Sequence, residues 1–162
     1  MVPEPFIPKV GARIMSLQEP TKKMSKSDDN ENNMVALLDT PKTIEKKFKR
    51  AVTDSGTEVR FDVENKAGVS NLLTIHSAFS GQSIADLEAH FAGKMYGHLK
   101  VETAEAVIEG LKPIQARYNE LMADKTGLED ILAAGAENAT HRAHKTLSKV
   151  YKKIGLVPRK HR

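Results

Sequence analysis

Apolar residues recur at helical spacing along most of the chain after residue 39. A first helix is predicted over residues 40–52, with Thr40 as the N-cap and Pro41 as the first helical residue. Threonine oxygens cap free backbone N–H groups, and proline fits a position where no N–H donor is needed. The inward face of this helix carries Ile44, Phe48 and Ala51.

Two shorter helices are expected next. The first has apolar positions at helical spacing and ends at Gly81, a residue that favours helix C-termini. Ser83 is expected to cap the second, with Asp86 in its first turn. The inward residues are Val69, Leu72, Leu73, His76 and Phe79 in the first helix, and Ile84, Leu87 and Phe91 in the second.

Two long helices are predicted after Gly93. In the first we expect Pro113 to kink or split the helix, because proline removes a backbone hydrogen bond. Thr126 and Glu129 have the spacing of a capping box for the second. Gly155 and then Pro158 mark its end. The apolar faces are Val107, Ile108, Leu111, Ile114, Tyr118, Leu121 and Met122, and then Leu128, Ile131, Leu132, Ala136, Ala139, Ala143, Leu147, Val150, Tyr151 and Ile154.

The N-terminal region lacks this periodicity. Residues 1–13 are proline-rich, residues 13–17 are consistent with a short strand, and residues 18–33 form a polar loop. A second short extended piece is predicted at residues 59–61. The pattern therefore predicts a mainly α protein, a helical bundle preceded by an irregular arm.

Composition agrees with a packed helical core. Apolar residues make up 40% of the chain but aromatic residues only 5%, which suits aliphatic helices better than a sheet sandwich. The absence of cysteine excludes disulfides and thiolate metal sites and is compatible with a reducing cytosol. His98, His141 and His144 lack ligand spacing with acidic partners, so we expect no metal site. His76, on an apolar face, is expected to be a hydrogen-bonded core residue.

Positive charge is concentrated in two places although the net charge is only +4. No acidic residue occurs from 138 to 162, where eight positions are Lys or Arg: Arg142, Lys145, Lys149, Lys152, Lys153, Arg159, Lys160 and Arg162. A second cluster contains Lys42, Lys46, Lys47, Lys49 and Arg50, with Glu45 as its one acid. One-sided charge of this kind indicates either a polyanion partner or a solvated helix face.

The segment Lys23-Met24-Ser25-Lys26-Ser27 has the composition of a phosphate-binding loop. Short serine side chains let the backbone approach phosphate oxygens, and hydroxyl and N–H groups donate to them. The two lysines supply positive charge where a pyrophosphate leaving group becomes more negative. Asp28 and Asp29, which follow, are expected to steady the loop or cap the next element rather than to bind a metal.

Lys23–Ser27 and its flanks resemble bacterial tryptophanyl-tRNA synthetases of class I. The blocks that carry this resemblance are residues 11–17 (GARIMSL), 51–55 (AVTDS), 63–73 (VENKAGVSNLL) and 93–99 (GKMYGHL). These blocks occur in the order that the family has, and the resemblance covers essentially the whole chain. The tyrosine-specific sister family shares the class architecture but usually has a different loop sequence.

The resemblance implies a two-step reaction, in which ATP activates tryptophan and the amino acid is then transferred to tRNA(Trp). The loop would close over ATP with Mg²⁺ present, Lys23 and Lys26 lying against the phosphates while Met24, Ser25 and Ser27 shape it. Ile14 falls where the family makes a backbone contact to adenine. The family is cytoplasmic and forms homodimers, largely through a part that this chain lacks.

The resemblance also implies an incomplete active site. No nucleotide-binding sheet, Gly-rich turn or His-Ile-Gly-His signature is present, and the family's tryptophan pocket lies in the same missing part. We therefore expect residues 1–38 to be the end of a Rossmann-like catalytic domain and residues 39–162 to be an anticodon-binding helical domain. The chain alone is expected not to activate tryptophan, because a loop without its scaffold is poorly positioned.

Binding of tRNA is expected at the basic C-terminal helix, through Arg142, Lys145 and Lys149 to backbone phosphate. Two other interpretations remain at this point. One is a stand-alone helical RNA-binding module whose loop is a relic, and the other is an interaction domain with a solvated basic face. Retention of both loop lysines argues against a relic.

Overall fold

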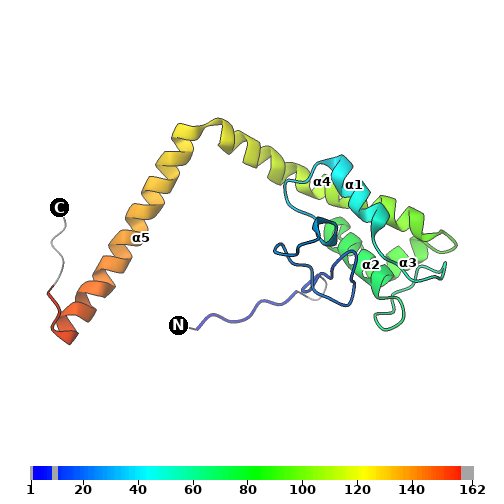
Figure 1. The fold of residues 1–162 in the computed structure, drawn as a ribbon, viewed down its shortest axis with the longest axis horizontal. Coiled ribbons are helices and arrows are strands. Elements are labelled where there is room, and N and C mark those ends of the chain that lie inside the picture. Colours follow the sequence, from blue (N-terminus) through cyan, green and yellow to red (C-terminus); the bar gives the residue numbers. More distant parts are fainter. Residues whose placement is uncertain (1, 9–10, 158–162) are drawn as a thin grey trace. The chain divides into compact units, whose positions relative to one another are not determined.

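The computed structural model describes residues 2–8 and 11–157 and is helical throughout its regular parts (Figure 1). Its elements are the 3-10 turn η1 (Glu31–Asn33) and the helices α1 (Pro41–Arg50), α2 (Ala67–Ser80), α3 (Ile84–His90), α4 (Tyr96–Ala123) and α5 (Lys125–Ile154). The described residues contain no strand. The chain divides into two compact units, residues 1–115 and 116–162, which are described separately below. The mainly α fold predicted from the sequence is confirmed.

Local signals place the ends of the helices in the first unit. The Thr40 hydroxyl accepts the Thr43 N–H at 3.3 Å at the start of α1. The Ser83 hydroxyl accepts the Asp86 N–H at 3.2 Å at the start of α3. Gly81 ends α2 in the left-handed region with φ of 74°, a conformation that side-chain-bearing residues adopt only at a cost. All three predicted ends are confirmed.

Pro113 does not split α4, which runs unbroken from Tyr96 to Ala123. A proline at this position leaves the Glu109 carbonyl without its helical N–H donor. Both residues are exposed, so that carbonyl can accept a hydrogen bond from solvent and the lost helical bond costs little. We predicted a kink or a split: the split was wrong for that reason, and the kink stays a prediction.

The predicted capping box of α5 was also wrong. Asp124 is the N-cap, and its carboxylate accepts the Gly127 N–H at 2.9 Å. Thr126 therefore lies inside the first turn. Asp is as good a cap as Thr, and here it stands directly after the last residue of α4. Pro158, the predicted stop signal, lies outside the described residues.

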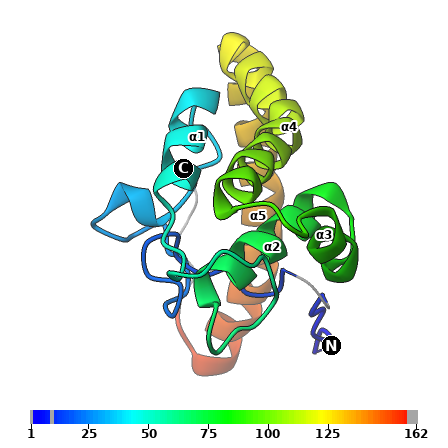
Figure 2. The same cartoon turned by 90° about the vertical axis from the view of Figure 1, so that its right-hand side faces the viewer.

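The first unit has one apolar core, to which the N-terminal arm also contributes. Figure 2 shows α1, α2, α3 and α4 around it. Its fully buried side chains include Leu17 from the arm, and from the helices Ile44, Phe48, Val69, Leu72, Leu73, Leu87, Phe91 and Leu99. His76 is buried as predicted, and its Nδ1 lies 3.3 Å from the Thr103 hydroxyl. Because burial disfavours the imidazolium form, the pKa of His76 is lowered.

The second unit contains the end of α4 and α5, and none of the residues of α5 is buried. Its predicted apolar stripe is exposed at Ile131, Leu132, Leu147, Val150 and Ile154. Among the described residues of this unit, the only other helical segment is the end of α4, and the stripe stays exposed beside it. Among the described helices, none combines the length and apolar character that crossing a bilayer requires.

The two predicted extended pieces are not strands. Residues 13–17 form a single antiparallel bridge, between Met15 and Lys23. Near residues 59–61, the Phe61 N–H donates to a Glu88 carboxylate oxygen at 2.6 Å rather than to a neighbouring strand. Both pieces lack a partner strand long enough to propagate the pairing.

Candidate functional site

The Lys23–Ser27 loop rises from a short base in which two backbone hydrogen bonds join its sides. The Met24 N–H donates to the Ile14 carbonyl at 3.0 Å, and the Ser16 N–H donates to the Lys22 carbonyl at 2.8 Å. These bonds hold the two ends of the loop together, so that residues 23–27 project from a defined position.

Asn71 of α2 fixes that base to the helical core. Its side-chain oxygen accepts the Met15 N–H, and its side-chain N–H donates to the Met15 carbonyl, both at 2.9 Å. Asn71 is only 5% exposed, so water competes little for these groups. A buried amide that pairs with both backbone groups of one residue is a rigid clamp between arm and helix.

The tip of the loop is a tight polar turn. The Ser25 and Ser27 hydroxyls lie 3.0 Å apart, and the Ser27 N–H donates to the Ser25 hydroxyl at 3.3 Å. Asp28 closes the turn on the far side, because its carboxylate accepts the Asn33 side-chain N–H at 2.9 Å and the Asn30 N–H at 3.0 Å. These two hydrogen bonds lower the pKa of Asp28, and the one from Asn33 has the larger effect. Asp28 thus steadies the loop, as predicted.

Lys23 and Lys26 are both exposed, and neither forms an ion pair within the described part of the chain. Their neighbour Lys22 differs, since its ammonium lies 2.5 Å from the Glu19 carboxylate, and the pKa of Lys22 is raised by that hydrogen bond. Two ammonium groups on a turn rich in hydroxyl and N–H donors form a surface suited to an anion such as a polyphosphate.

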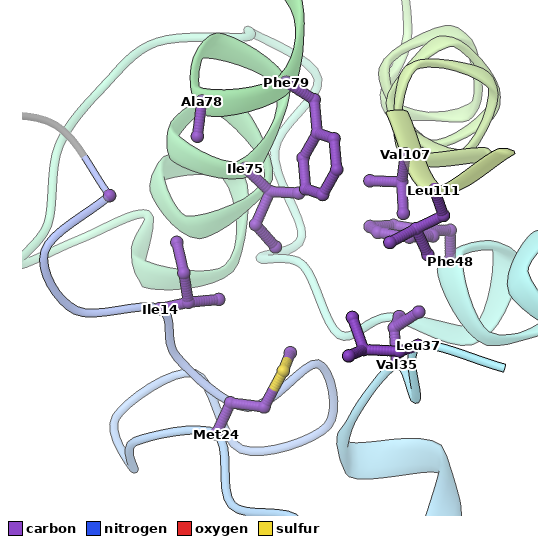
Figure 3. Close-up of a pocket in the computed structure, with 11 residues that line it drawn as sticks. Ile14, Met24, Val35, Leu37, Phe48, Ile75, Ala78, Phe79, Val107 and Leu111 are labelled. Atoms are coloured by element: carbon purple, nitrogen blue, oxygen red, sulfur yellow. The ribbon is translucent and has the colours of Figure 1, made fainter. Parts of the chain in front are cut away.

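Met24 connects the loop to the apolar core. It is half-buried, and Figure 3 shows its side chain pointing, with that of Ile14, into a cavity of about 210 Å³. The cavity is lined almost entirely by apolar groups from the arm and from α1, α2 and α4, including Val35, Leu37, Phe48, Ile75, Ala78, Phe79, Val107 and Leu111. The sequence predicted only that Met24 shapes the loop. That its side chain also packs toward the core is visible only in the structure.

A polar network that the sequence did not predict joins three distant segments of the first unit. One Asp54 carboxylate oxygen accepts the Tyr96 hydroxyl at 2.7 Å, the Gly56 N–H at 2.8 Å and the Lys66 ammonium at 3.2 Å. Burial raises the pKa of Asp54, but these hydrogen bonds outweigh it and the net pKa is lowered. Asp54, Lys66 and Tyr96 all lie within the blocks that resemble the synthetase family. Nothing else in the sequence indicated that they have a role.

The basic face of α5 belongs to the second unit. Arg142, Lys145 and Lys149 are exposed and lie at i, i+3 and i+7, which places them on one side of the helix. None of the ion pairs formed by the described residues involves these three side chains, and Glu137 is the last acidic side chain in the sequence. Among the described residues, no group of three His, Cys, Asp or Glu side chains is arranged to hold a metal ion.

The comparisons with known proteins agree on one family. The profile described as tRNA synthetases class I (W and Y) matches residues 1–112. The tryptophan–tRNA ligase of Bacillus anthracis is 56% identical over 155 residues, which make up 96% of this chain and 47% of that protein.

Solved structures show the same likeness. Tryptophanyl-tRNA synthetase from Mycoplasma pneumoniae superposes with a TM-score of 0.77 at 34% identity, over 93% of this chain and 45% of that one. The enzyme from Campylobacter jejuni, complexed with ADP and tryptophan, gives a TM-score of 0.68 at 32% identity, over 89% and 44%. The chain spans about half the length of these relatives and is similar to their C-terminal part. It belongs to the class I tRNA synthetases for tryptophan and tyrosine, on the tryptophanyl-tRNA synthetase branch.

Proposed function

We propose that this chain is the part of a tryptophan–tRNA ligase that supplies the phosphate-binding loop and a tRNA-binding surface. In the whole enzyme, the tryptophan carboxylate attacks the α-phosphate of ATP and releases pyrophosphate. The terminal ribose hydroxyl of tRNA(Trp) then attacks the acyl group of the adenylate, and AMP leaves. The observation that carries the proposal is two exposed lysines, Lys23 and Lys26, which form no ion pair among the described residues and lie on a loop whose base is clamped to the core.

Lys23 and Lys26 are proposed to stabilise the negative charge that develops on the departing pyrophosphate. Fixed cations act strongly on a transition state because they need no reorganisation as the charge moves. The serines supply hydroxyl and backbone donors beside them. Mg²⁺ is proposed to enter with ATP as part of the substrate.

Ile14 is proposed to contact adenine through its backbone. Its carbonyl accepts the Met24 N–H, and a carbonyl oxygen has a second lone pair for a further donor. This hydrogen bond would link the nucleotide base to the loop that holds the phosphates, because Met24 is the second residue of that loop.

The helical part is proposed to bind tRNA through Arg142, Lys145 and Lys149. We further propose that residues 1–38 complete a nucleotide-binding domain and that residues 39–162 form the anticodon-binding domain. The clamp between Asn71 and Met15 and the shared core support a fixed connection between the two. We also propose a cytoplasmic location and, for the intact enzyme, a homodimer.

Complementation tests this division of labour. The purified 162-residue chain should show no tryptophan-dependent pyrophosphate exchange, because positioning supplies much of the rate acceleration. Joining the N-terminal half of the Bacillus anthracis ligase to this chain in one reading frame should restore exchange and tRNA charging. Exchange by the chain alone would contradict the proposal. RNA binding without any restored activity would favour the stand-alone RNA-binding module instead.

A further inference from the structure

Helix α1 has two chemically distinct sides. Ile44, Phe48 and Ala51 are buried in the core, as is the Lys47 side chain. The opposite side carries Lys42, Lys46, Lys49 and Arg50, all exposed. At 3.6 residues per turn, these four cations fall within an arc of about 100° and span about 12 Å along the helix axis. They form the outer face of α1.

The fifth cation of the helix has a structural role that the other four do not share. The Lys47 ammonium lies 2.6 Å from the Asp39 carboxylate, and the two side chains are 7% and 16% exposed. The same carboxylate oxygen accepts the Ala36 N–H at 2.9 Å. Lys47 is therefore committed to the fold, and its charge is neutralised inside it.

The four outer cations have almost no compensation. Glu45 is the one acid of α1, and its carboxylate lies 3.9 Å from the Lys49 ammonium. No other carboxylate of the described residues pairs with this face. Together with Glu45 the four side chains line a shallow recess on the surface.

Part of this arrangement opposes the stability of the helix, although Lys49 and Arg50 lie in the last turn, where the helix dipole favours positive charge. Lys42 lies in the first turn, where the helix dipole favours negative charge, and no acid accompanies it there. Lys46 faces Lys42 and Arg50 at four-residue spacing and Lys49 at three, and like charges at these spacings repel. A face kept only for solubility would gain from mixed charges.

We infer that the outer face of α1 binds the phosphate backbone of an RNA helix, as a second surface besides the basic face of α5. The inference rests on the proposed function, in which that RNA is tRNA(Trp). A row of cations matches a row of phosphates and gives affinity without sequence preference. The one aromatic side chain of α1, Phe48, is buried, so the face offers no platform on which an unpaired base could stack.

The test compares two variants of the 162-residue chain that lose the same charge. One replaces the outer face of α1 (Lys42→Gln, Lys46→Gln, Lys49→Gln, Arg50→Gln). The control replaces four other cations of the first unit, three of which have carboxylate partners: Arg60→Gln, Lys94→Gln, Lys100→Gln and Lys112→Gln. Fluorescence anisotropy gives the Kd for tRNA(Trp) and for an unrelated RNA duplex between 50 and 200 mM salt, and thermal unfolding gives Tm.

The α1 variant should bind both RNAs more weakly, with a slope of log K against log salt that is shallower by about 3 for four lost contacts. Between 50 and 200 mM salt it should therefore lose about 60-fold less affinity than the wild type. Its Tm should change little, because relief of the repulsion around Lys42 and Lys46 offsets the loss of Lys49 and Arg50 from the last turn. The control should keep a slope close to that of the wild type.

Several results would overturn the inference. An unchanged slope in the α1 variant, with tRNA binding by the wild type intact, removes the α1 site and leaves the proposed function standing. Equal losses of RNA affinity in the α1 variant and the control would mean that the effect comes from net charge and not from the α1 face. If the α1 variant has a lower Tm and also binds more weakly, the four cations have a structural role. The single variant Lys42→Gln, which relieves the first turn, then separates the two effects. A salt slope shallower by the equivalent of one contact, at unchanged Tm, supports the inference, and an unchanged slope overturns it. If the α1 variant loses binding to phosphatidylserine vesicles while its RNA binding is unaffected, the face belongs to a membrane partner and the inference is overturned. Failure of the wild type to bind either RNA defeats both proposals.

Discussion

Replacing Asn71 by aspartate tests the clamp that holds the loop base to α2. The change keeps the shape of the side chain and the oxygen that accepts the Met15 N–H. It replaces the N–H group that donates to the Met15 carbonyl with a second carboxylate oxygen, 2.9 Å from that carbonyl in the present geometry. Two oxygens then face each other at a position that is 5% exposed.

The expected cost is about 2–4 kcal/mol. About 1 kcal/mol comes from the lost hydrogen bond, and the remainder from a buried acceptor without a donor and a carboxylate taken out of water. That is a large fraction of the 5–15 kcal/mol by which a domain is typically stable. Urea unfolding of the 162-residue chain, followed by circular dichroism, measures it as a lower midpoint at unchanged m-value.

The pH dependence gives the sharper readout. Burial and the facing carbonyl raise the folded-state pKa of the new carboxyl above its unfolded value near 3.9. Because its protonated form donates to the Met15 carbonyl, the lost stability should return as pH falls and disappear again as pH rises through the folded pKa. Asn119→Asp, at an exposed position of α4, should change stability by less than about 0.5 kcal/mol. Equal effects at both positions, or no recovery at low pH, would refute the clamp.

Three further predictions concern other parts of the fold. Gly68→Ala places a Cβ against the Val52 carbonyl and should cost about 1–3 kcal/mol, whereas Gly97→Ala, with open space around it, should stabilise the chain by a few tenths to about 1 kcal/mol, both measured by urea unfolding. The lowered pKa of Asp54 means that its contribution to stability is present above its unfolded pKa and is lost as pH falls through the folded value. Asp54→Asn should therefore flatten the acid side of the stability profile, and an unchanged profile would argue against the network. Asp124→Ala removes the cap of α5 and should cost about 0.5–2 kcal/mol of helix stability, seen as lower helicity in circular dichroism. Thr126→Ala should leave the helicity unchanged.

Sequence reasoning succeeded where the signal is local. The caps at Thr40 and Ser83 and the stop at Gly81 are each contained within a few residues, so neighbouring letters are enough to locate them. The start of α5 was predicted wrongly because Asp124 and Thr126 can both cap a helix. Only the path of the chain in three dimensions selects between them. The stripe of α5 has helical period, but a period alone does not say what the stripe packs against.

The candidate site divides in the same way. Lys23 and Lys26 were identified as candidates from the five-residue sequence of the loop, and the flanking blocks narrowed the resemblance to one synthetase family. The clamp was not, because Asn71 and Met15 are 56 positions apart, and an asparagine within an apolar helix gives no sign of its partner. Asp54, Lys66 and Tyr96 meet only through the fold, and the burial of Met24 depends on residues from three helices.

The most direct test of the central claim is the double change Lys23→Ala and Lys26→Ala in the chain joined to its nucleotide-binding half. Pyrophosphate exchange and tRNA(Trp) charging should fall by at least about 100-fold, the loss typical of one fixed donor to a developing anion. The KM for tryptophan should stay the same. Lys22→Ala, whose ammonium is already paired with Glu19, should alter the rate by only a few fold. Charging at the wild-type rate in the double variant would contradict the account.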